Sequence, residues 1–275
     1  MKHYRKVLSI AGSDSGGGAG IQADIKTISA CGCYAATAIT AITVQNTLGV
    51  QAVHAVPTEI LRGQIDAVLS DIGADAVKIG MLHSSEVVRL VREMLIRFNA
   101  GNIVLDPVMV STSGHRLIEE DAIASLRTEL LPLARVITPN IPEAEILLGG
   151  RKLSFQSELP DAARELAESS GASVLLKAGH LSEDDLSDIF YDLEDGKCYS
   201  LTSKRIHTKN THGTGCTMSS AFASMLAKGM SLPDAAKVAK DFINGAILSG
   251  KDYEIGHGFG PVNHLYLQER NGEIH

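Results

Sequence analysis

Short apolar runs alternate with longer amphipathic segments along most of the chain. The short runs consist mainly of apolar residues, many of which are β-branched, and they predict buried strands. They lie at residues 7–11, 38–44, 76–79, 103–105, 136–137 and 174–176. The longer segments repeat apolar residues at helical spacing and lie at residues 57–69, 87–98, 119–131, 142–148, 160–168 and 233–248. This alternation predicts an α/β fold with a mainly parallel sheet and helices on both of its faces.

One pair of strands departs from this pattern. Residues 189–193 and 197–201 flank the turn formed by Glu194, Asp195 and Gly196, which predicts a small antiparallel hairpin. The chain contains no internal repeat, low-complexity tract or linker-like segment. We therefore expect one domain over residues 1–275.

Polar and glycine residues follow most of the predicted strands. Ligands of open α/β sheets bind beyond the carboxyl ends of the strands, so these residues mark the expected site. They are Gly12, Gln45, Gly80, Met81, Asp106, Asn140, Lys177 and Thr211.

The segment N-T-H-G-T-G-C-T-M at 210–218 is the most informative. Gly213 and Gly215 let the backbone approach a ligand closely, and a helical pattern begins at once. The unpaired amides of a helix start favour an anion, most often a phosphate. Cys216 would lie in the first turn, where the pKa of a thiol is lowered, and is a candidate base. The alternative is a tight turn before a core helix, with Cys216 as a small buried residue.

A second glycine-rich loop, at residues 12–20, joins a strand to a helix. It fits neither the P-loop spacing nor the dinucleotide-binding spacing. We predict a loop whose backbone contacts a small ligand. Asp24 follows in the first helical turn, where pairing with the helix dipole is the alternative role. Lys240 lies within the helix predicted at 233–248, and most helix lysines are exposed to solvent.

The charge and the cysteines narrow the function. The net charge is −7 and no long basic run occurs, so a nucleic-acid role is improbable. Cys31, Cys33, Cys198 and Cys216 do not form the paired C-x-x-C sets of a structural zinc site. We find no signal peptide and no apolar stretch long enough to span a membrane, so we expect a cytoplasmic protein.

Motifs along the whole chain resemble those of a known family. They are A-G-S-D-S-G-G-G-A-G-I-Q-A-D at 11–24, V-Q-N-T at 44–47, K-I-G-M-L at 78–82, L-D-P-V-M at 105–109, T-P-N-I-P-E-A at 138–144, L-K-A-G-H at 176–180, N-T-H-G-T-G-C at 210–216 and G-H-G-F-G-P-V-N-H at 256–264. Together they resemble the ribokinase-like superfamily, and within it the hydroxymethylpyrimidine/phosphomethylpyrimidine kinases of thiamine biosynthesis. The wider superfamily has Asp at the position of Cys216.

The resemblance implies a three-layer sandwich and ATP-dependent phosphorylation of 4-amino-5-hydroxymethyl-2-methylpyrimidine and then of its monophosphate. It implies ATP and Mg²⁺ as cofactors and a homodimer. Substrate contacts are implied for Gly12, Ala19, Asp24, Gln45, Met81 and Val108. ATP contacts are implied for Asn140, Lys177, Thr211 and Lys240, and magnesium contacts for Asp106 and Glu143. Gly213, Thr214 and Gly215 would form the anion hole, with Cys216 as the base.

Three other functions were weighed against this one. A pyridoxine or pyridoxal kinase of the same fold would also act on a small heteroaromatic ring with a hydroxymethyl group. A ligand sensor without catalysis has no need of the anion hole, the two acids and Cys216. A dinucleotide-dependent oxidoreductase conflicts with the failed glycine spacing at residues 12–20.

Overall fold

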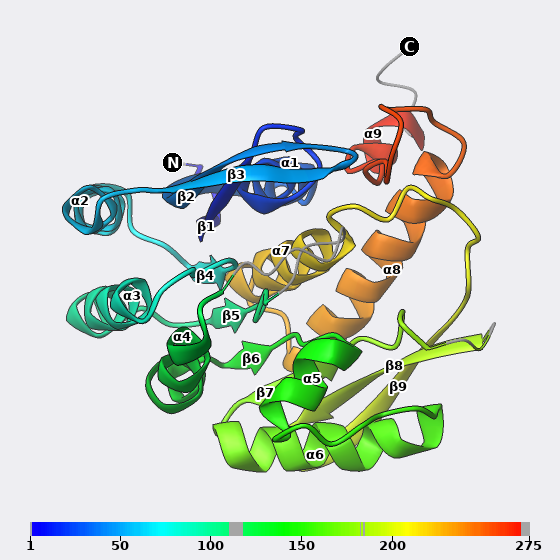
Figure 1. Ribbon diagram of the computed structural model, residues 1–275. Coiled ribbons are helices and arrows are strands. Elements are labelled where there is room, and N and C mark those ends of the chain that lie inside the picture. The colour runs from blue at the N-terminus through cyan, green and yellow to red at the C-terminus, as the bar shows by residue number, and fades with distance from the viewer. Residues whose placement is uncertain (1, 110–117, 182, 184, 271–275) are drawn as a thin grey trace.

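A single sheet runs through the computed structural model, which describes residues 2–109, 118–181, 183 and 185–270 (Figure 1). Its strands are β1 (Lys6–Asp14), β2 (Tyr34–Asn46), β3 (Gly49–Ala55), β4 (Ala76–Ile79), β5 (Ile103–Leu105), β6 (Val136–Ile137), β7 (Ser173–Leu176), β8 (Asp185–Asp192) and β9 (Lys197–Lys204). They are ordered β3-β2-β1-β4-β5-β6-β7-β8-β9. The six strands from β2 to β7 in this order pair in parallel. The remaining pairs, β2 with β3, β7 with β8 and β8 with β9, are antiparallel.

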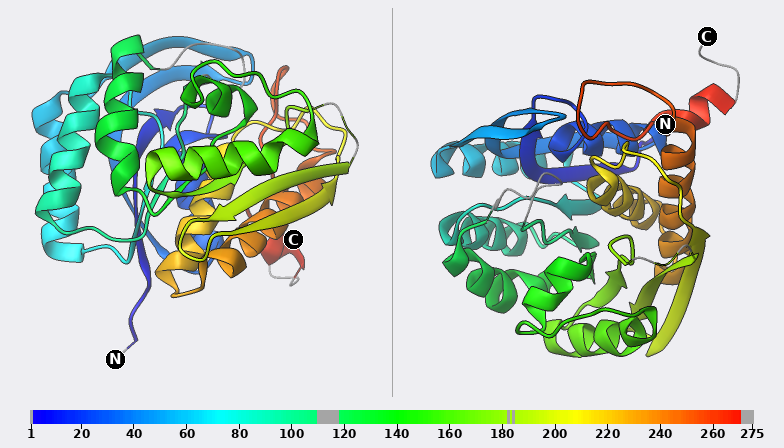
Figure 2. Two further views of the ribbon diagram at one scale, coloured as in Figure 1. Left: turned by 90° about the horizontal axis from the view of Figure 1, so that it is seen from below. Right: turned by 45° about the vertical axis from the view of Figure 1, so that its right-hand side comes forward.

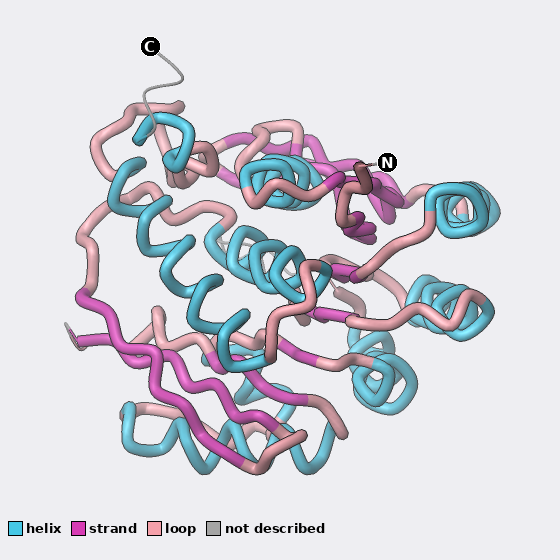
Figure 3. The backbone as a smooth tube through the Cα atoms, turned by 180° about the vertical axis from the view of Figure 1, so that it is seen from behind, coloured by secondary structure: helices cyan, strands magenta, loops and turns pink. Residues whose placement is uncertain are grey.

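Helices cover both faces of the sheet. One layer contains α2 (Thr58–Ala67), α3 (Ser85–Arg97), α4 (Glu120–Ser125), α5 (Ile141–Leu147) and α6 (Leu159–Ser170). The other contains α1 (Gly20–Ala30), α7 (Thr214–Ala227), α8 (Leu232–Gly250) and α9 (Tyr266–Arg270). Figure 2 shows the two layers from further directions, and Figure 3 shows α8 in front of the sheet when the molecule is seen from behind. The predicted three-layer sandwich is confirmed.

Each layer encloses its own hydrophobic core. In β1, Leu8 and Ile10 face the core of α2 to α6, while Val7 faces the core of α1, α7 and α8. Both faces of this central strand are buried, which explains why apolar residues occupy positions on both of its faces. Ser9 points to the same side as Val7 and is fully buried, so its hydroxyl must find a partner there.

Several predicted boundaries agree with the structure. β4, β5 and β6 begin and end as predicted, and the predicted hairpin is confirmed as β8 and β9. Strand β1 continues to Asp14, three residues past the predicted end. The predicted helices at 57–69 and 119–131 each change into a π-helical turn, at Val68–Ile72 and Leu126–Leu130.

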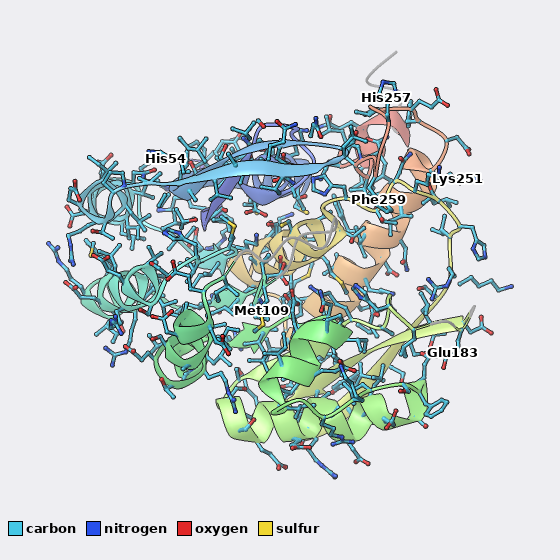
Figure 4. All side chains as sticks on the ribbon, viewed as in Figure 1. His54, Met109, Glu183, Lys251, His257 and Phe259 are labelled. Carbon is cyan, nitrogen blue, oxygen red and sulfur yellow. The ribbon has the colours of Figure 1, made fainter. Side chains whose placement is uncertain are left out.

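The edge strand β3 was not predicted. It pairs with β2, and its residues are mostly exposed, so its sequence lacks an apolar face. The tip of this hairpin contacts the C-terminal loop, because Phe259 N donates to Thr47 O (2.9 Å) and Gly258 N donates to Thr47 Oγ1 (3.1 Å). Figure 4 labels Phe259 beside the end of the hairpin. Among the helices described, none is long and apolar enough to cross a bilayer.

Candidate functional site

A cavity of about 640 Å³ opens at the carboxyl ends of the central strands. Fifteen of the sixteen predicted site residues line it. They are Gly12, Ala19, Gln45, Met81, Asp106, Val108, Asn140, Glu143, Lys177, Thr211, Gly213, Thr214, Gly215, Cys216 and Lys240. Asp24 is the exception. The position of the cavity agrees with the rule that ligands of such sheets bind beyond the carboxyl ends of the strands.

The turn at the start of α7 has the glycine-rich backbone geometry that an anion cradle would need. Gly213 is the N-cap with φ 81°, a left-handed conformation that side chains rarely adopt. A Cβ on Gly213 would also overlap the carbonyl oxygen of Gly18. A Cβ on Gly215 would lie 3.2 Å from Lys177 Nζ and 3.3 Å from Asp106 Oδ2. The helix start therefore meets a cation and a carboxylate at close range, with no side chain between them.

Lys177 and Asp106 form a buried ion pair beside this turn. Lys177 Nζ lies 2.8 Å from Asp106 Oδ1, which also accepts from Thr138 Oγ1 (3.0 Å). Burial opposes the charge of Lys177, but the charges of Asp106 and Glu143 outweigh it and raise the pKa of this lysine. Lys177 is therefore charged at neutral pH, and can neutralise negative charge held by the cradle.

Glu143 and Asn140 form the start of α5. Asn140 Oδ1 accepts from Glu143 N (2.9 Å) and Glu143 Oε2 accepts from Asn140 N (2.8 Å), a capping box. Burial raises the pKa of Glu143 to about 7, with Lys177 lowering it and Asp106 raising it. Part of this carboxyl group is therefore used to hold the start of the helix.

The predicted electrostatics of Cys216 are wrong. Cys216 lies in the first turn of α7 and lines the cavity, as expected. However, burial raises the pKa of its thiol to about 11, although Lys78 and the Gly20 backbone amide act to lower it. The desolvation of a thiolate in this pocket outweighs the favourable helix start. Cys216 is thus a neutral thiol at neutral pH in the ligand-free protein.

The predicted contact between Asp24 and the substrate also needs correction. Asp24 is a fully buried residue of α1 and does not line the cavity. Its carboxylate pairs with Lys78 Nζ at 2.8 and 2.9 Å. It also accepts hydrogen bonds from Ser9 Oγ (2.6 Å) and Ser220 Oγ (2.7 Å). These four contacts occupy both oxygens, so Asp24 joins elements rather than contacting a ligand.

Lys240 does not lie on a solvated helix face. Its side chain is buried, and its Nζ lies 2.8 Å from Asp188 Oδ2. The other oxygen of Asp188 accepts from Ala178 N (2.7 Å). Lys240 therefore links α8 to β8 at the wall of the cavity. Asp188 was not found from the sequence, because a lone acid within a strand pattern carries no signal of a buried partner 52 residues away.

The opposite end of the cavity suits a small flat ring. Met81 and Val108 provide apolar surface, and Gly12 lies against Met81, where a Cβ would come within 2.6 Å of the Met81 methyl carbon. Gln45 Oε1 accepts from Thr43 Oγ1 (3.0 Å). The Gln45 amide thus lies at the cavity wall in a fixed orientation, where it can exchange hydrogen bonds with a ring.

Two residues that organise this end were not singled out by the sequence analysis. Asp14 is buried and accepts backbone hydrogen bonds from Gly16, Gly18 and Ala19. His212 Nε2 lies 2.8 Å from Asp14 Oδ2. The glycine-rich loop was expected to press its backbone against a ligand, but its amides bind the protein's own carboxylate. The acid that opens the loop, G-S-D-S-G-G-G, was the available signal.

Comparison with known proteins gives a consistent result. The sequence model of a family described as phosphomethylpyrimidine kinase matches residues 14–263. A hydroxymethylpyrimidine/phosphomethylpyrimidine kinase from Rhizobium meliloti (strain 1021) is 48% identical over 259 residues, which cover 94% of this chain and 96% of that protein. A solved ADP complex of Bacillus subtilis pyridoxal kinase has 37% identity and a TM-score of 0.88, covering 97% of this chain and 99% of that one.

Longer relatives contain a similar sequence as one part. A probable thiamine biosynthetic bifunctional enzyme from rice chloroplasts (Oryza sativa subsp. japonica) is 48% identical over 263 residues. The match covers 94% of this chain but 47% of that protein. The chain thus spans about half the length of this relative and nearly all of the bacterial one.

Proposed function

Because the chain belongs to the phosphomethylpyrimidine kinase family, we propose that it transfers the terminal phosphoryl group of ATP to 4-amino-5-hydroxymethyl-2-methylpyrimidine and then to the resulting monophosphate. The observation that carries the proposal is the cradle of Gly213 and Gly215, which shares one cavity with Lys177, Asp106 and an apolar ring pocket. The ADP complex of the pyridoxal kinase relative supports ATP as the donor.

Phosphoryl transfer depends mainly on positioning and charge neutralisation. The backbone amides at the start of α7 can stabilise, by hydrogen bonding, the negative charge that develops on the moving phosphoryl group. Lys177 supplies a buried positive charge next to Gly215. The ring pocket of Met81 and Val108 directs the acceptor oxygen of the pyrimidine toward this turn, because both line the same cavity as Cys216.

The residues present fit a magnesium ion. Mg²⁺ prefers oxygen ligands and usually keeps several waters beside one or two carboxylates and substrate phosphates. Asp106 Oδ2 faces the cradle and, among the described residues, receives only a long 3.5 Å contact from Ser219 Oγ, so Asp106 would hold the ion. Glu143 would assist with its oxygen that is not engaged by Asn140. The bound ion would neutralise phosphate charge.

The two acceptors place different demands on Cys216. The alcohol must lose a proton, and the minor thiolate form of Cys216 is the cavity-lining base that we assign to receive it. The monophosphate offers an oxygen that is already ionised, so it needs no base. A neutral thiol also leaves the approach of this anion unopposed, whereas a carboxylate there would repel it.

The second candidate is a pyridoxal kinase. It is favoured by the similarity of the fold to the Bacillus subtilis pyridoxal kinase, at a TM-score of 0.88. Both substrates are small heteroaromatic rings with a hydroxymethyl group, and the cavity dimensions do not distinguish them.

A product assay tests both candidates. The protein is incubated with ATP, Mg²⁺ and either the pyrimidine alcohol or pyridoxal, and the products are resolved by mass spectrometry. We expect the mono- and diphosphate of the pyrimidine, and a lower kcat/KM with pyridoxal. Equal or better turnover of pyridoxal would reverse the order of the two candidates. Formation of the monophosphate alone would remove the second step from the proposal.

We also propose a homodimer and a cytoplasmic setting, with residues 1–275 acting as one kinase domain. The β2–β3 hairpin supports the dimer, because Ile42 and Val44, on one face of β2, are each about half exposed. The four cysteines are all free, which supports a reducing compartment. Sedimentation of the protein at several concentrations tests the dimer.

A further inference from the structure

The carboxylate of Asp14 fills a nest of backbone amides in the first glycine-rich loop. Oδ1 accepts from Gly16 N (2.8 Å), and Oδ2 accepts from Gly18 N (3.1 Å) and Ala19 N (2.8 Å). Such nests bind anions, and here the anion belongs to the chain itself. These bonds and the His212 contact outweigh the effect of burial and lower the pKa of Asp14. The loop is therefore built around a charged carboxylate.

His212 connects this nest to the anion cradle. Its Nε2 lies 2.8 Å from Asp14 Oδ2, across 198 positions of sequence, and the next residue is Gly213. The two loops also touch directly. A Cβ on Gly18 would overlap the imidazole of His212, and a Cβ on Gly213 would overlap the Gly18 carbonyl oxygen. The loops interlock so closely that a shift in one requires a shift in the other.

The backbone of His212 is held by the C-terminal loop. His212 N donates to Gly260 O (3.0 Å), and the residue pairs with Pro261 as an isolated β-bridge. The same C-terminal loop holds the tip of the β2–β3 hairpin through Phe259 and Thr47. Gln45 is the last residue but one of strand β2 in this hairpin, and its Nε2 lies 3.3 Å from His212 Nε2. His212 thus contacts three separate segments at the cavity wall, namely the first glycine-rich loop, the C-terminal loop and the β2–β3 hairpin.

We propose that Asp14 and His212 are positioning residues that hold the acceptor side of the cavity in register with the anion cradle. The acceptor side is formed by Ala19 and Gln45, and the cradle begins one residue after His212. This inference rests on the proposed function, because it concerns the alignment of an acceptor with a phosphoryl group. It assigns the pair to transfer itself, and not to the binding of either ligand.

The physical reason is the steep dependence of transfer on alignment. A displacement of about 1 Å can cost about 100-fold in rate. Loss of the Asp14–His212 contact leaves Asp14 bound by its own loop amides, so each loop keeps its local structure. What is lost is the side-chain bond between them. The nucleotide would still meet Lys177 and the cradle, but the acceptor would no longer be held against it.

Three variants test the inference. His212→Leu removes the contact, whereas His212→Gln retains an amide nitrogen that can reach Asp14. Asp14→Asn replaces a carboxylate oxygen by a donor that faces the loop amides, and serves if His212→Leu does not fold. Kinetics with the pyrimidine alcohol, nucleotide binding by calorimetry and ATP hydrolysis without acceptor are measured for each. Ser173→Ala is the matched control, because Ser173 is equally buried and bonds Leu193 N (3.0 Å) and Asp192 Oδ1 (3.3 Å) away from the cavity.

We expect His212→Leu and Asp14→Asn to lower kcat for transfer by about 100-fold. Nucleotide affinity stays near that of the wild type, and hydrolysis rises relative to transfer. His212→Gln recovers part of kcat, and Ser173→Ala lowers the melting temperature without changing kcat. An unchanged kcat in His212→Leu, an equal loss of nucleotide affinity, or no recovery in His212→Gln would overturn the inference alone. A wild-type protein that phosphorylates neither ring would overturn the proposed function, and this inference with it.

Discussion

Lys78 Nζ lies 2.8 Å from Asp24 Oδ1, and neither side chain is exposed to solvent. The pair connects the end of the first glycine-rich loop, through α1, to β4 in the middle of the sheet. Ser220 on α7 bonds the same carboxylate, so the helix that carries the cradle is tied to it as well. Burial opposes the charge of Lys78, but the charge of Asp24 outweighs it and raises the pKa of the lysine. Lys78 is therefore charged in the folded protein.

Removing one partner of this pair should destabilise the fold strongly. Lys78→Met leaves Asp24 as an unpaired buried charge, which typically costs about 3–5 kcal/mol. The double variant Lys78→Met/Asp24→Asn should recover part of this loss, because no uncompensated charge remains. Urea unfolding of the wild type and of each variant measures the free energies. Lys78→Met with the stability of the wild type would contradict the prediction.

Asp24→Asn should act on stability far more than on the substrate. The structure gives Asp24 no surface on the cavity, so we expect a lower unfolding free energy and an acceptor KM close to that of the wild type. Steady-state kinetics with the pyrimidine alcohol and urea unfolding of the same preparation check this. A variant with unchanged stability and a raised KM would restore the ring-binding role that the motif suggested.

Cys216 should be slow to react with iodoacetamide at neutral pH. Burial raises the pKa of its thiol to about 11, so the reactive thiolate is scarce at pH 7 and increases until the pH approaches that value. Mass spectrometry of the peptide containing Cys216 measures the alkylation rate between pH 7 and pH 10. Rapid alkylation that is independent of pH over this range would mean that the thiolate is already formed.

Cys216→Ala should affect the two phosphorylations differently. A positioned base typically contributes 10²–10⁴-fold, and a thiol that is mostly protonated should fall at or below about 100-fold. We expect that loss for the alcohol and a smaller one for the monophosphate, whose oxygen is already ionised. Cys216→Asp, which places a carboxylate at the same point, should impair the monophosphate more than the alcohol. The kcat/KM of each variant is measured separately for the alcohol and for the monophosphate. An equal loss of kcat/KM for both acceptors in Cys216→Ala would contradict the assignment of Cys216 as the base.

Gly213→Ala should abolish transfer. The residue has φ 81°, and a Cβ would overlap the Gly18 carbonyl oxygen, so both loops would have to move. We expect a kcat reduced by about 100-fold or more, because the cradle amides lose their alignment. Gly63→Ala is the control, since it lies within α2 with no atom within 4 Å of the added carbon. The control should keep full activity and gain about 0.4–1 kcal/mol of stability.

The fold was largely predictable because its strands are buried on both faces. Runs such as 103–105 and 136–137 are apolar throughout, and the crossover rule then fixes a parallel sheet. The exposed strand β3 gave no such signal, because its side chains contact little. The ends of the helices at 57–69 and 119–131 were also beyond reach, since both pass into π-helical turns without a glycine or proline in the preceding turn.

The location of the site was predictable, but its internal pairing was not. Strand ends and the glycine turn at 213–216 identified eleven lining residues, since chain topology alone brings them together, and the family resemblance supplied Ala19, Val108, Glu143 and Lys240. Whether a charged group faces the cavity or a neighbour depends on side chains far apart in sequence. Asp24 with Lys78, Asp188 with Lys240 and Asp14 with His212 are all of this kind. The predicted lowering of the Cys216 thiol pKa was wrong for the same reason, because the position of a residue in a helix does not indicate how deeply its side chain is buried.

His264 should make the protein less stable as the pH falls below neutral. Only 3% of this histidine is exposed, and its Nε2 has no hydrogen-bond partner within the part of the chain that the structure describes. Burial lowers its pKa to about 4 from 6.5, assisted by the nearby charges of Lys26 and His212. The unfolded chain therefore binds a proton between pH 6.5 and 4 that the folded chain excludes, so stability decreases as the pH falls through this window.

The shift corresponds to about 2 kcal/mol of lost stability between pH 7.5 and pH 5. Urea unfolding at several pH values over this range measures the slope for the wild type and for His264→Leu, which cannot titrate. Other groups, such as Asp14, contribute equally to both proteins and cancel in the comparison. We expect a flatter profile for His264→Leu below pH 6.5. Parallel profiles for the two proteins would show that His264 is protonated in the folded state, with a partner that accepts its charge.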